Sequence, residues 1–176
     1  MVKARCLIAF FSRRGNNYVN GRIVNLPVGN TEAAALAIRK LTGGDLFRID
    51  PVKEYPADYE ETTEVAKQEL CRNARPELSA HVVNMDEYGV IFLGYPNWWG
   101  TMPMAVCTFL EAYGFSGKAI VPFCTHEGSG MGRSESDVKR LCPKADVRKG
   151  LPILGGNVQY AGDDIQAWLK GAGLMD

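Results

Sequence analysis

The chain has 176 residues, of which 46% are hydrophobic and 23% are charged, which is the composition of an ordinary globular protein. Its 20 basic residues balance its 20 acidic residues, so it has no broad electrostatic field to attract nucleic acid or an anionic membrane. Five cysteines without a Cys-x-x-Cys pair, together with only two histidines, argue against a metal cluster and indicate reduced cysteines, several of them in the core.

Five short apolar runs predict β-strands, at residues 6–11, 46–49, 90–93, 119–124 and 151–154. Their continuous rather than alternating apolar character is typical of strands that are covered on both faces. The first run is too short to span a membrane and no cleavage site follows it, so we expect a cytoplasmic protein. Pro122 interrupts the fourth run, and we expect either a bulge there or an early end of that strand.

Amphipathic helices are predicted between these strands. Apolar residues recur at i, i+3, i+4 and i+7 in three segments, which begin at Ala34, Val106 and Ile165. Two further helices are predicted over residues 58–72 and 134–141. The alternation of strands and helices predicts an α/β fold with a parallel sheet, in a single domain over residues 1–176.

The segment after the first strand begins at Ser12 and makes a long polar excursion before it enters a helix at Gly29-Asn30-Thr31. A helix N-terminus offers unpaired backbone N–H groups and a partial positive charge. With the hydroxyls of Ser12 and Thr31 and the amide of Asn30, it would form a cradle for a phosphate group. The alternative is that Asn30 or Thr31 merely caps the helix.

The loop after the third strand carries two adjacent tryptophans, Trp98 and Trp99, followed by Gly100. Both rings cannot easily face one core, so we expect at least one of them either to be exposed or to shield a flat ligand. The alternative is that both close the bottom of a pocket or an interface. Gly100 lets the backbone approach a ligand closely, and Pro96 and Pro103 stiffen the segment.

The loop after the fourth strand, residues 125–132, is rich in glycine, so its backbone donors could point at a ligand. The alternative is a flexible connector. In an open parallel sheet, ligands bind beyond the carboxyl ends of the strands. Taken together, the three loops predict one site with a phosphate end and an aromatic end, which is the shape of FMN.

These segments resemble the flavodoxin-like superfamily, and specifically a short-chain flavodoxin-type FMN-binding family, over essentially the whole chain. The resemblance rests on Ser12, on Gly29-Asn30-Thr31 with the small Ala35, and on residues 94–100 and 125–130. Residues 94–100 are its most specific element. The resemblance implies a three-layer fold with a five-stranded parallel sheet in the order 2-1-3-4-5, with helices on both faces and FMN across the carboxyl edge.

The resemblance also implies which residues would bind the cofactor. Ser12, Asn30 and Thr31 would hold the phosphate. Residues 96–100 would border the dimethylbenzene side and the redox-active edge of the flavin, and residues 125–130 would reach its pyrimidine side. The complete predicted set is Ser12, Arg14, Asn30, Thr31, Pro96, Asn97, Trp98, Trp99, Gly100, Thr125, His126, Gly128, Ser129 and Gly130.

Two features depart from the usual flavodoxin pattern. Ser12 and Asn30 are separated by a long insertion, so we expect Arg14 or Tyr18 either to touch the phosphate or to cover the site. The neutral charge differs from the strongly acidic character of flavodoxins that shuttle electrons, and it argues against a dedicated shuttle role. No catalytic residue is assigned; His126 is a candidate general acid, with a surface or loop-stabilising role as the alternative.

We therefore predict a redox flavoprotein that transfers electrons through FMN to a partner protein or a small-molecule acceptor, as a monomer or a homodimer. The alternative is an NAD(P)H-dependent quinone or flavin reductase on the same fold, although no nicotinamide motif is recognisable. A third hypothesis is a family member that has lost its flavin and serves as an interaction domain. A receiver domain, a dinucleotide-binding domain and a serine hydrolase are rejected, because the acidic pair, the GxGxxG motif and the GxSxG motif are absent.

Overall fold

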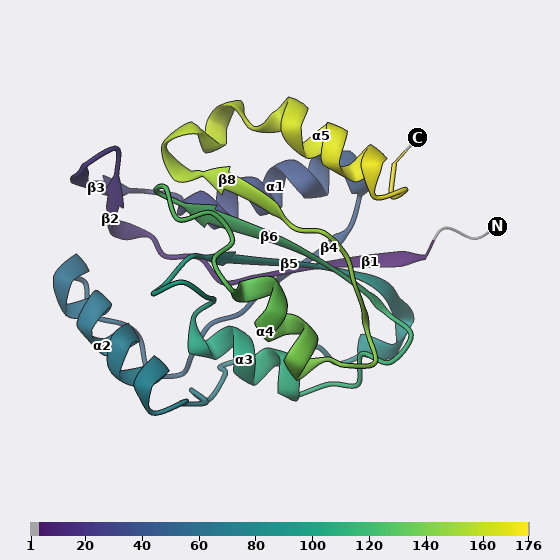
Figure 1. The fold of residues 1–176 in the computed structure, drawn as a ribbon, viewed down its shortest axis with the longest axis horizontal. Coiled ribbons are helices and arrows are strands. Elements are labelled where there is room, and N and C mark those ends of the chain that lie inside the picture. Colours follow the sequence, from purple (N-terminus) through teal and green to yellow (C-terminus); the bar gives the residue numbers. More distant parts are fainter. Residues whose placement is uncertain (1–3, 176) are drawn as a thin grey trace.

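The computed structural model describes residues 4–175, which form a central parallel sheet between two layers of helices (Figure 1). The strands of this sheet are β1 (Arg5–Phe10), β4 (Asp45–Arg48), β5 (Tyr88–Pro96), β6 (Ala119–His126), β7 (Asp146–Val147) and β8 (Leu151–Leu154). They are arranged in the order β4-β1-β5-β6-β7, and β8 also pairs with β6. This is the predicted order 2-1-3-4-5, except that two short strands share the fifth position.

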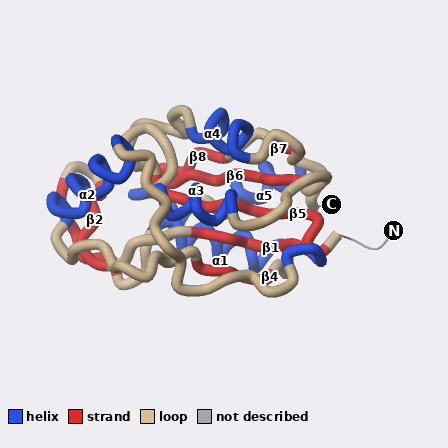
Figure 2. Tube along the Cα trace, turned by 90° about the horizontal axis from the view of Figure 1, so that it is seen from below, coloured by secondary structure: helices blue, strands red, loops and turns tan. Residues whose placement is uncertain are grey.

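The helices cover both faces of the sheet, as predicted. Helices α1 (Asn30–Thr42) and α5 (Gly162–Gly171) lie on one face, and α3 (Met104–Glu111) and α4 (Ser134–Leu141) lie on the other (Figures 1 and 2). Helix α2 (Tyr59–Cys71) lies beyond α3, toward the carboxyl ends of the strands. Two short 3-10 helices, η1 (Met85–Glu87) and η2 (Gly155–Tyr160), precede β5 and α5.

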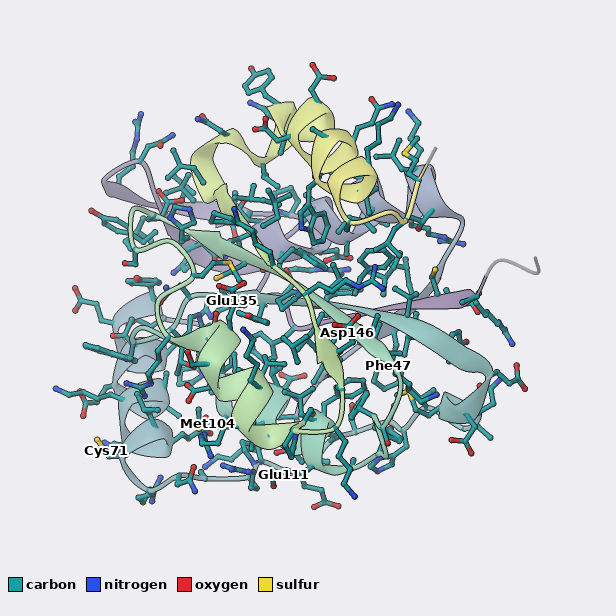
Figure 3. All side chains as sticks on the ribbon, turned by 45° about the vertical axis from the view of Figure 1, so that its right-hand side comes forward. Phe47, Cys71, Met104, Glu111, Glu135 and Asp146 are labelled. Atoms are coloured by element: carbon teal, nitrogen blue, oxygen red, sulfur yellow. The ribbon has the colours of Figure 1, made fainter. Side chains whose placement is uncertain are left out.

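Strand alternation divides the core into two clusters, because successive side chains of a strand point to opposite faces of the sheet. Ile8 of β1 packs with Ile38 and Ile165 on the α1 and α5 side. Leu7 packs with Phe109 on the α3 and α4 side. The side chains fill the space between the layers, whereas Cys71 at the end of α2 lies on the outside (Figure 3). Both faces of the sheet are therefore buried, which explains the continuous apolar runs in the sequence.

The expected bulge or early end at Pro122 is wrong, because β6 continues through Pro122 to His126 and stays in register with β5. The Ile120 carbonyl accepts a hydrogen bond from Arg148 just beyond β7, so the Pro122 nitrogen, two residues on, faces that same side. There β7 has ended at Val147, and β8 begins pairing only at Phe123. The missing N–H therefore falls in the gap between the two short strands.

The insertion after Ser12 forms an antiparallel hairpin, made of β2 (Gly15–Val19) and β3 (Arg22–Leu26). Asn20 and Gly21 form its two-residue turn, with φ angles of 50° and 84°. Both angles lie in the left-handed region that a tight hairpin of this length requires. The hairpin lies at the carboxyl edge of the sheet, between α1 and α2 (Figure 1).

Within residues 4–175, no helix is long and apolar enough to cross a membrane. Over the same part of the chain, no three histidine, cysteine or acidic side chains are grouped so that they could hold a metal ion. Cys107, Cys124 and Cys142 are buried, in agreement with the prediction that several cysteines belong to the core. Burial raises the pKa of the Cys124 thiol to about 12, so it stays protonated.

Candidate functional site

The loops at the carboxyl ends of β1, β5 and β6 surround a cavity of about 320 Å³, called here the central cavity. Nine of the residues that the sequence predicts for the site line it: Ser12, Asn30, Thr31, Pro96, Asn97, Trp98, Thr125, His126 and Ser129. The parallel sheet brings these residues together because its strand ends share one edge.

The N-terminus of α1 lies at one end of the central cavity. Its cap residue, Gly29, contributes no side-chain hydrogen bond, and neither Asn30 nor Thr31 caps the helix, so that alternative is wrong. Ser12 Oγ instead accepts a hydrogen bond of 3.0 Å from the Glu32 N–H. The backbone N–H groups of Asn30 and Thr31 have no acceptor among the described residues. They remain available for a ligand anion.

Two glycines allow neighbouring groups to pack closely at this end of the cavity. A Cβ on Gly29 would overlap Ser12 Oγ and lie 2.6 Å from the Arg13 carbonyl oxygen. A Cβ on Gly155 would overlap Glu127 Oε1 and lie 2.6 Å from Asn30 Nδ2. Any side chain at either position would therefore push apart groups that face the cavity.

Glu127, which the sequence reasoning missed, presents an unsatisfied acceptor. Its Oε2 accepts a hydrogen bond of 3.0 Å from the Asn20 N–H at the tip of the β2–β3 hairpin. Its Oε1 is buried and has no hydrogen-bond partner among the described residues. A buried acceptor without a donor costs roughly 1–3 kcal/mol. A ligand hydroxyl or N–H group would remove that cost.

The two tryptophans lie on opposite sides of a tight turn. Trp99 and Gly100 have φ angles of 54° and 83°, and the Trp98 N–H donates to the Thr101 carbonyl over 2.8 Å. Trp98 faces inward and packs edge-to-face on Phe11, with ring centroids 5.1 Å apart. Trp99 faces outward and is 50% exposed. The expectation that the two rings do not both face one core is confirmed, because Trp99 is exposed and only Trp98 lines the central cavity.

Asn97 joins the tryptophan turn to the glycine-rich loop. Its N–H donates to the Thr125 carbonyl over 2.8 Å, and its Nδ2 donates to the Gly130 carbonyl over 2.9 Å. Its Oδ1 accepts from the Gly100 N–H over 3.0 Å. These hydrogen bonds hold the Asn97 side chain in place where it lines the cavity. Gly100, Gly128 and Gly130 shape these loops without lining the cavity.

The loop after β1, the β2–β3 hairpin and α2 supply further lining residues that the sequence reasoning left out of the predicted set, namely Arg13, Asn17, Tyr18 and Tyr59. Tyr18 stacks on Tyr59, with ring centroids 6.1 Å apart and planes 25° apart. Arg13 donates to the carbonyl of Pro56 and to the hydroxyl of Thr62, which fixes the start of α2 against the loop. Burial lowers the pKa of Arg13 and raises that of Tyr59.

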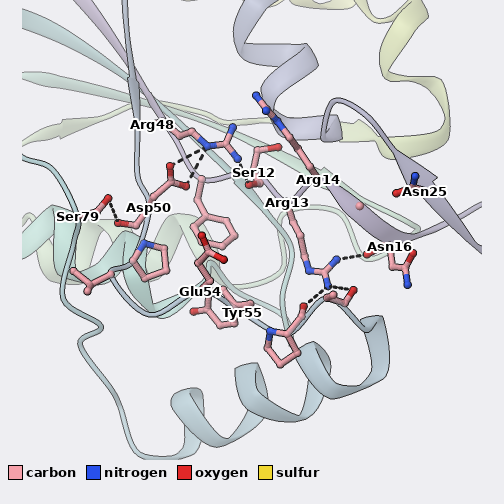
Figure 4. A pocket seen from close by; sticks show the side chains of 16 residues that line it. Ser12, Arg13, Arg14, Asn16, Asn25, Arg48, Asp50, Glu54, Tyr55 and Ser79 are labelled. Carbon is pink, nitrogen blue, oxygen red and sulfur yellow. Dashed lines mark hydrogen bonds and ion pairs between the residues drawn. The ribbon is translucent and has the colours of Figure 1, made fainter.

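Arg14 points away from the central cavity. It pairs with Glu32 at 2.8 Å, and Arg48 pairs with the same carboxylate at 2.9 Å. The hydrogen bond from Arg14 and the charge of Arg48 hold the pKa of Glu32 below its usual range. Arg14 instead lines a larger cavity, of about 880 Å³, beyond the 12–16 loop (Figure 4). Of the two residues expected to touch the phosphate or cover the site, Tyr18 lines the central cavity, whereas Arg14 lines the larger cavity instead.

His126 is held as a neutral imidazole. Its Nδ1 accepts a hydrogen bond of 2.9 Å from the Gly128 N–H, which requires that nitrogen to be unprotonated. Burial lowers the pKa of His126, and the nearby Glu127 carboxylate opposes this shift only in part. The histidine thus stabilises its own loop, which is the alternative weighed against a catalytic role.

This depressed pKa predicts a pH-dependent stability. The unfolded chain binds a proton at His126 near the ordinary pKa of about 6.5, whereas the folded chain resists it, so stability falls as the pH drops below that value. We expect His126→Asn, whose Oδ1 can still accept from Gly128, to flatten the fall in unfolding free energy between about pH 7.5 and pH 5. Urea unfolding measures it, with His81→Asn on the surface as the control. An unchanged slope in His126→Asn would contradict the prediction.

Comparison with known proteins places this site in context. The chain matches the model of the flavodoxin family over residues 24–172. A protein of Bacteroides eggerthii classed as a flavoprotein is 29% identical, with a TM-score of 0.77 over 95% of this chain and 96% of that chain. A similar protein of Bacteroides uniformis is 25% identical, with a TM-score of 0.75 over 95% and 98%.

A flavoprotein of Lactobacillus acidophilus, crystallised in complex with FMN, is 19% identical, with a TM-score of 0.68 over 89% of this chain and 97% of that chain. At that identity the likeness concerns the fold alone. No curated protein matches the sequence significantly.

Proposed function

The chain belongs to the flavodoxin family, and on that premise we propose that it is a redox protein which binds FMN in the central cavity and transfers electrons through it. One observation carries the proposal. A single cavity joins the free N–H groups at the start of α1 to the ring of Trp98, so it offers an anion site and an aromatic wall together. When bound, FMN supplies the electron and hydride chemistry, and the protein tunes it.

The phosphate end of the cavity fits the cofactor. The N–H groups of Asn30 and Thr31 would donate to the phosphate oxygens at the positive end of the α1 dipole. Ser12 Oγ accepts from Glu32, so its own hydrogen is available to a phosphate oxygen. The Thr31 hydroxyl is held in place by a 2.7 Å hydrogen bond with the Thr125 hydroxyl.

The remainder of the cavity fits the sugar-like chain and the flavin. A hydroxyl of the ribityl chain is the kind of donor that the buried Glu127 Oε1 lacks. Pro96 and Trp98 would border the flat ring from one loop and Ser129 from the other. Tyr18 and Tyr59 would shield the site from water on the hairpin side.

The alternative function is an NAD(P)H-dependent quinone or flavin reductase. It is supported by the zero net charge, which gives the chain no field to steer a strongly charged protein partner. We also propose that the protein is cytoplasmic. Its electron acceptor would be either a small molecule or a partner protein. Steady-state oxidation of NADH or NADPH with a quinone separates the two functions, since a carrier oxidises neither nucleotide.

Titration with two flavins tests the cofactor proposal. We expect the flavin-free protein to bind FMN and quench its fluorescence, and to bind riboflavin at least about 100-fold more weakly, because charge-assisted hydrogen bonds to the phosphate contribute roughly 1.5–3 kcal/mol each. A colourless protein that fails to take up added FMN would overturn the proposal. Equal affinities for FMN and riboflavin would contradict the proposal that the phosphate binds at the start of α1.

A further inference from the structure

Arg48 is the last residue of β4, at the edge of the sheet, and lies beside Phe10 in the parallel register of β4 with β1. Successive side chains of a strand point to opposite faces, so Arg48 shares a face with Leu46, which packs in the core on the α1 side. Its Cζ lies 5.7 Å from the centroid of the Phe10 ring. The strand thus directs a guanidinium toward the start of α1.

The guanidinium of Arg48 joins three segments of the chain. Its Nη2 donates to the Ser12 carbonyl over 2.7 Å, and its Nη1 donates to Glu32 Oε2 over 2.9 Å. The Glu32 N–H in turn donates to Ser12 Oγ over 3.0 Å. These hydrogen bonds form a closed ring that links the end of β4, the loop after β1 and the first turn of α1. Ser12 is therefore held against α1 through both its carbonyl and its hydroxyl.

Charge alone does not explain why Arg48 occupies this place. Arg14 pairs with Glu32 at 2.8 Å, and Arg48 pairs with the same carboxylate at 2.9 Å. Arg48 also pairs with Asp50 at 3.0 Å (Figure 4). These two positive and two negative charges cancel, so together they attract a phosphate only weakly. Within the part of the chain that the structure describes, Arg14 makes no hydrogen bond to Ser12. The contact with the loop thus distinguishes Arg48 from Arg14.

We propose that Arg48 is a positioning residue that gives the site its preference for a flavin with a phosphate group. Arg48 lines the larger cavity and not the central one, so it acts through Ser12. By fixing Ser12, it keeps the hydroxyl directed at the same anion as the N–H groups of Asn30 and Thr31. A guanidinium suits this role because its planar fork donates in several fixed directions. The identity of the ligand rests on the proposed function, whereas the ring of hydrogen bonds does not.

Titration of the flavin-free full chain with FMN and with riboflavin tests the inference, because only FMN carries the phosphate. We expect Arg48→Met to weaken FMN binding at least about tenfold and riboflavin binding less than about twofold. Arg14→Met is the matched comparison, since it removes the same charge from the same carboxylate without touching Ser12. It should weaken FMN binding at most about threefold.

Arg48→Lys separates position from charge. It keeps the positive charge but loses the planar fork, so it should recover only part of the FMN affinity that Arg48→Met loses. Full recovery in Arg48→Lys, or equal losses in Arg48→Met and Arg14→Met, would overturn the inference, because charge alone would then explain the effect. A parallel loss of riboflavin would also overturn it. If Arg48→Met does not fold by circular dichroism, Arg48→Lys must still prefer FMN over riboflavin less than the unaltered protein does.

Hydrogen exchange in the flavin-free protein distinguishes this inference from the cofactor proposal. The Glu32 N–H, which donates to Ser12 Oγ, should exchange at least about tenfold faster in Arg48→Met than in the unaltered protein. Arg75→Met loses a comparable pair, with Glu111, at a place that lines neither cavity, and should leave this exchange within about twofold. Unchanged exchange in Arg48→Met would overturn the inference. Failure of the unaltered protein to take up FMN would instead overturn the cofactor proposal.

Discussion

Gly29→Ala is expected to weaken FMN binding at least about 100-fold, the equivalent of about 2.7 kcal/mol. The φ of Gly29 is −66°, so the backbone itself accepts alanine. The obstacle is contact, because the new Cβ would overlap Ser12 Oγ and press on the Arg13 carbonyl oxygen at 2.6 Å. Relief of this contact must move the 12–16 loop away from the start of α1, which opens the cradle proposed for the phosphate.

Gly162→Ala is the matched control, since Gly162 is also a glycine at the start of a helix and has nothing within 4 Å of the added Cβ. Fluorescence titration with FMN gives the affinities, and circular dichroism checks that both variants fold. If Gly29→Ala does not fold, Ser12→Ala removes the hydroxyl alone and should weaken FMN about tenfold. FMN affinities of Gly29→Ala and Gly162→Ala within about threefold of each other would refute the cradle.

Trp98→Ala is expected to lower the free energy of unfolding by about 2–3 kcal/mol, somewhat less than the roughly 3–5 kcal/mol for a fully buried aromatic residue. Trp98 is half-buried, and its ring packs edge-to-face on Phe11 and Tyr55, with centroids 5.1 Å away in both cases. Its removal leaves a gap beneath the central cavity and loosens the turn. FMN binding should weaken with it, because the aromatic wall of the site is lost.

The neighbouring Trp99→Ala provides the comparison. That ring is 50% exposed, and its hydrogen bond to the Thr63 carbonyl and its contact with Lys67 lie at the surface of α2, so its loss should cost less than about 1 kcal/mol. Urea unfolding of the flavin-free proteins measures both effects without the contribution of the cofactor. A larger loss for Trp99→Ala than for Trp98→Ala would mean that the two rings have the opposite roles.

Local sequence signals predicted the elements of the main sheet and the helices well. The apolar run at residues 151–154 coincides with β8, and the amphipathic segment at 134–141 coincides with α4. The hairpin was missed, although Asn20-Gly21 is a strong turn signal. Its strands carry few buried residues, so their hydrophobic pattern is weak. Pro122 led to the wrong prediction of a bulge or an early strand end. The sequence does not reveal that the strand position beside Pro122 is interrupted between β7 and β8, so that no N–H is needed there.

The candidate site was predictable to the extent that it depends on strand ends. Ser12 follows β1, Thr31 lies in the first turn of α1 and Thr125 lies near the end of β6, and a parallel sheet must bring such segments to one edge. Arg14 could not be placed in this way, since its orientation depends on Glu32, which it shares with Arg48. Glu127 escaped attention because an acidic residue in a glycine-rich loop gives no signal of burial until Gly155 and Asn20 are seen to pack around it.

The sequence alone determined the order of the elements and the three loops that form the site, because hydrophobic periodicity and glycine positions act over a few residues. It also predicted that Trp98 and Trp99 would not both face one core. Only the tertiary structure decided which ring faces the cavity, since this depends on the left-handed turn and on contacts of Trp99 with α2. It likewise decided that the hairpin residue Tyr18 lines the site together with Tyr59 of α2, because these side chains lie far apart in the chain.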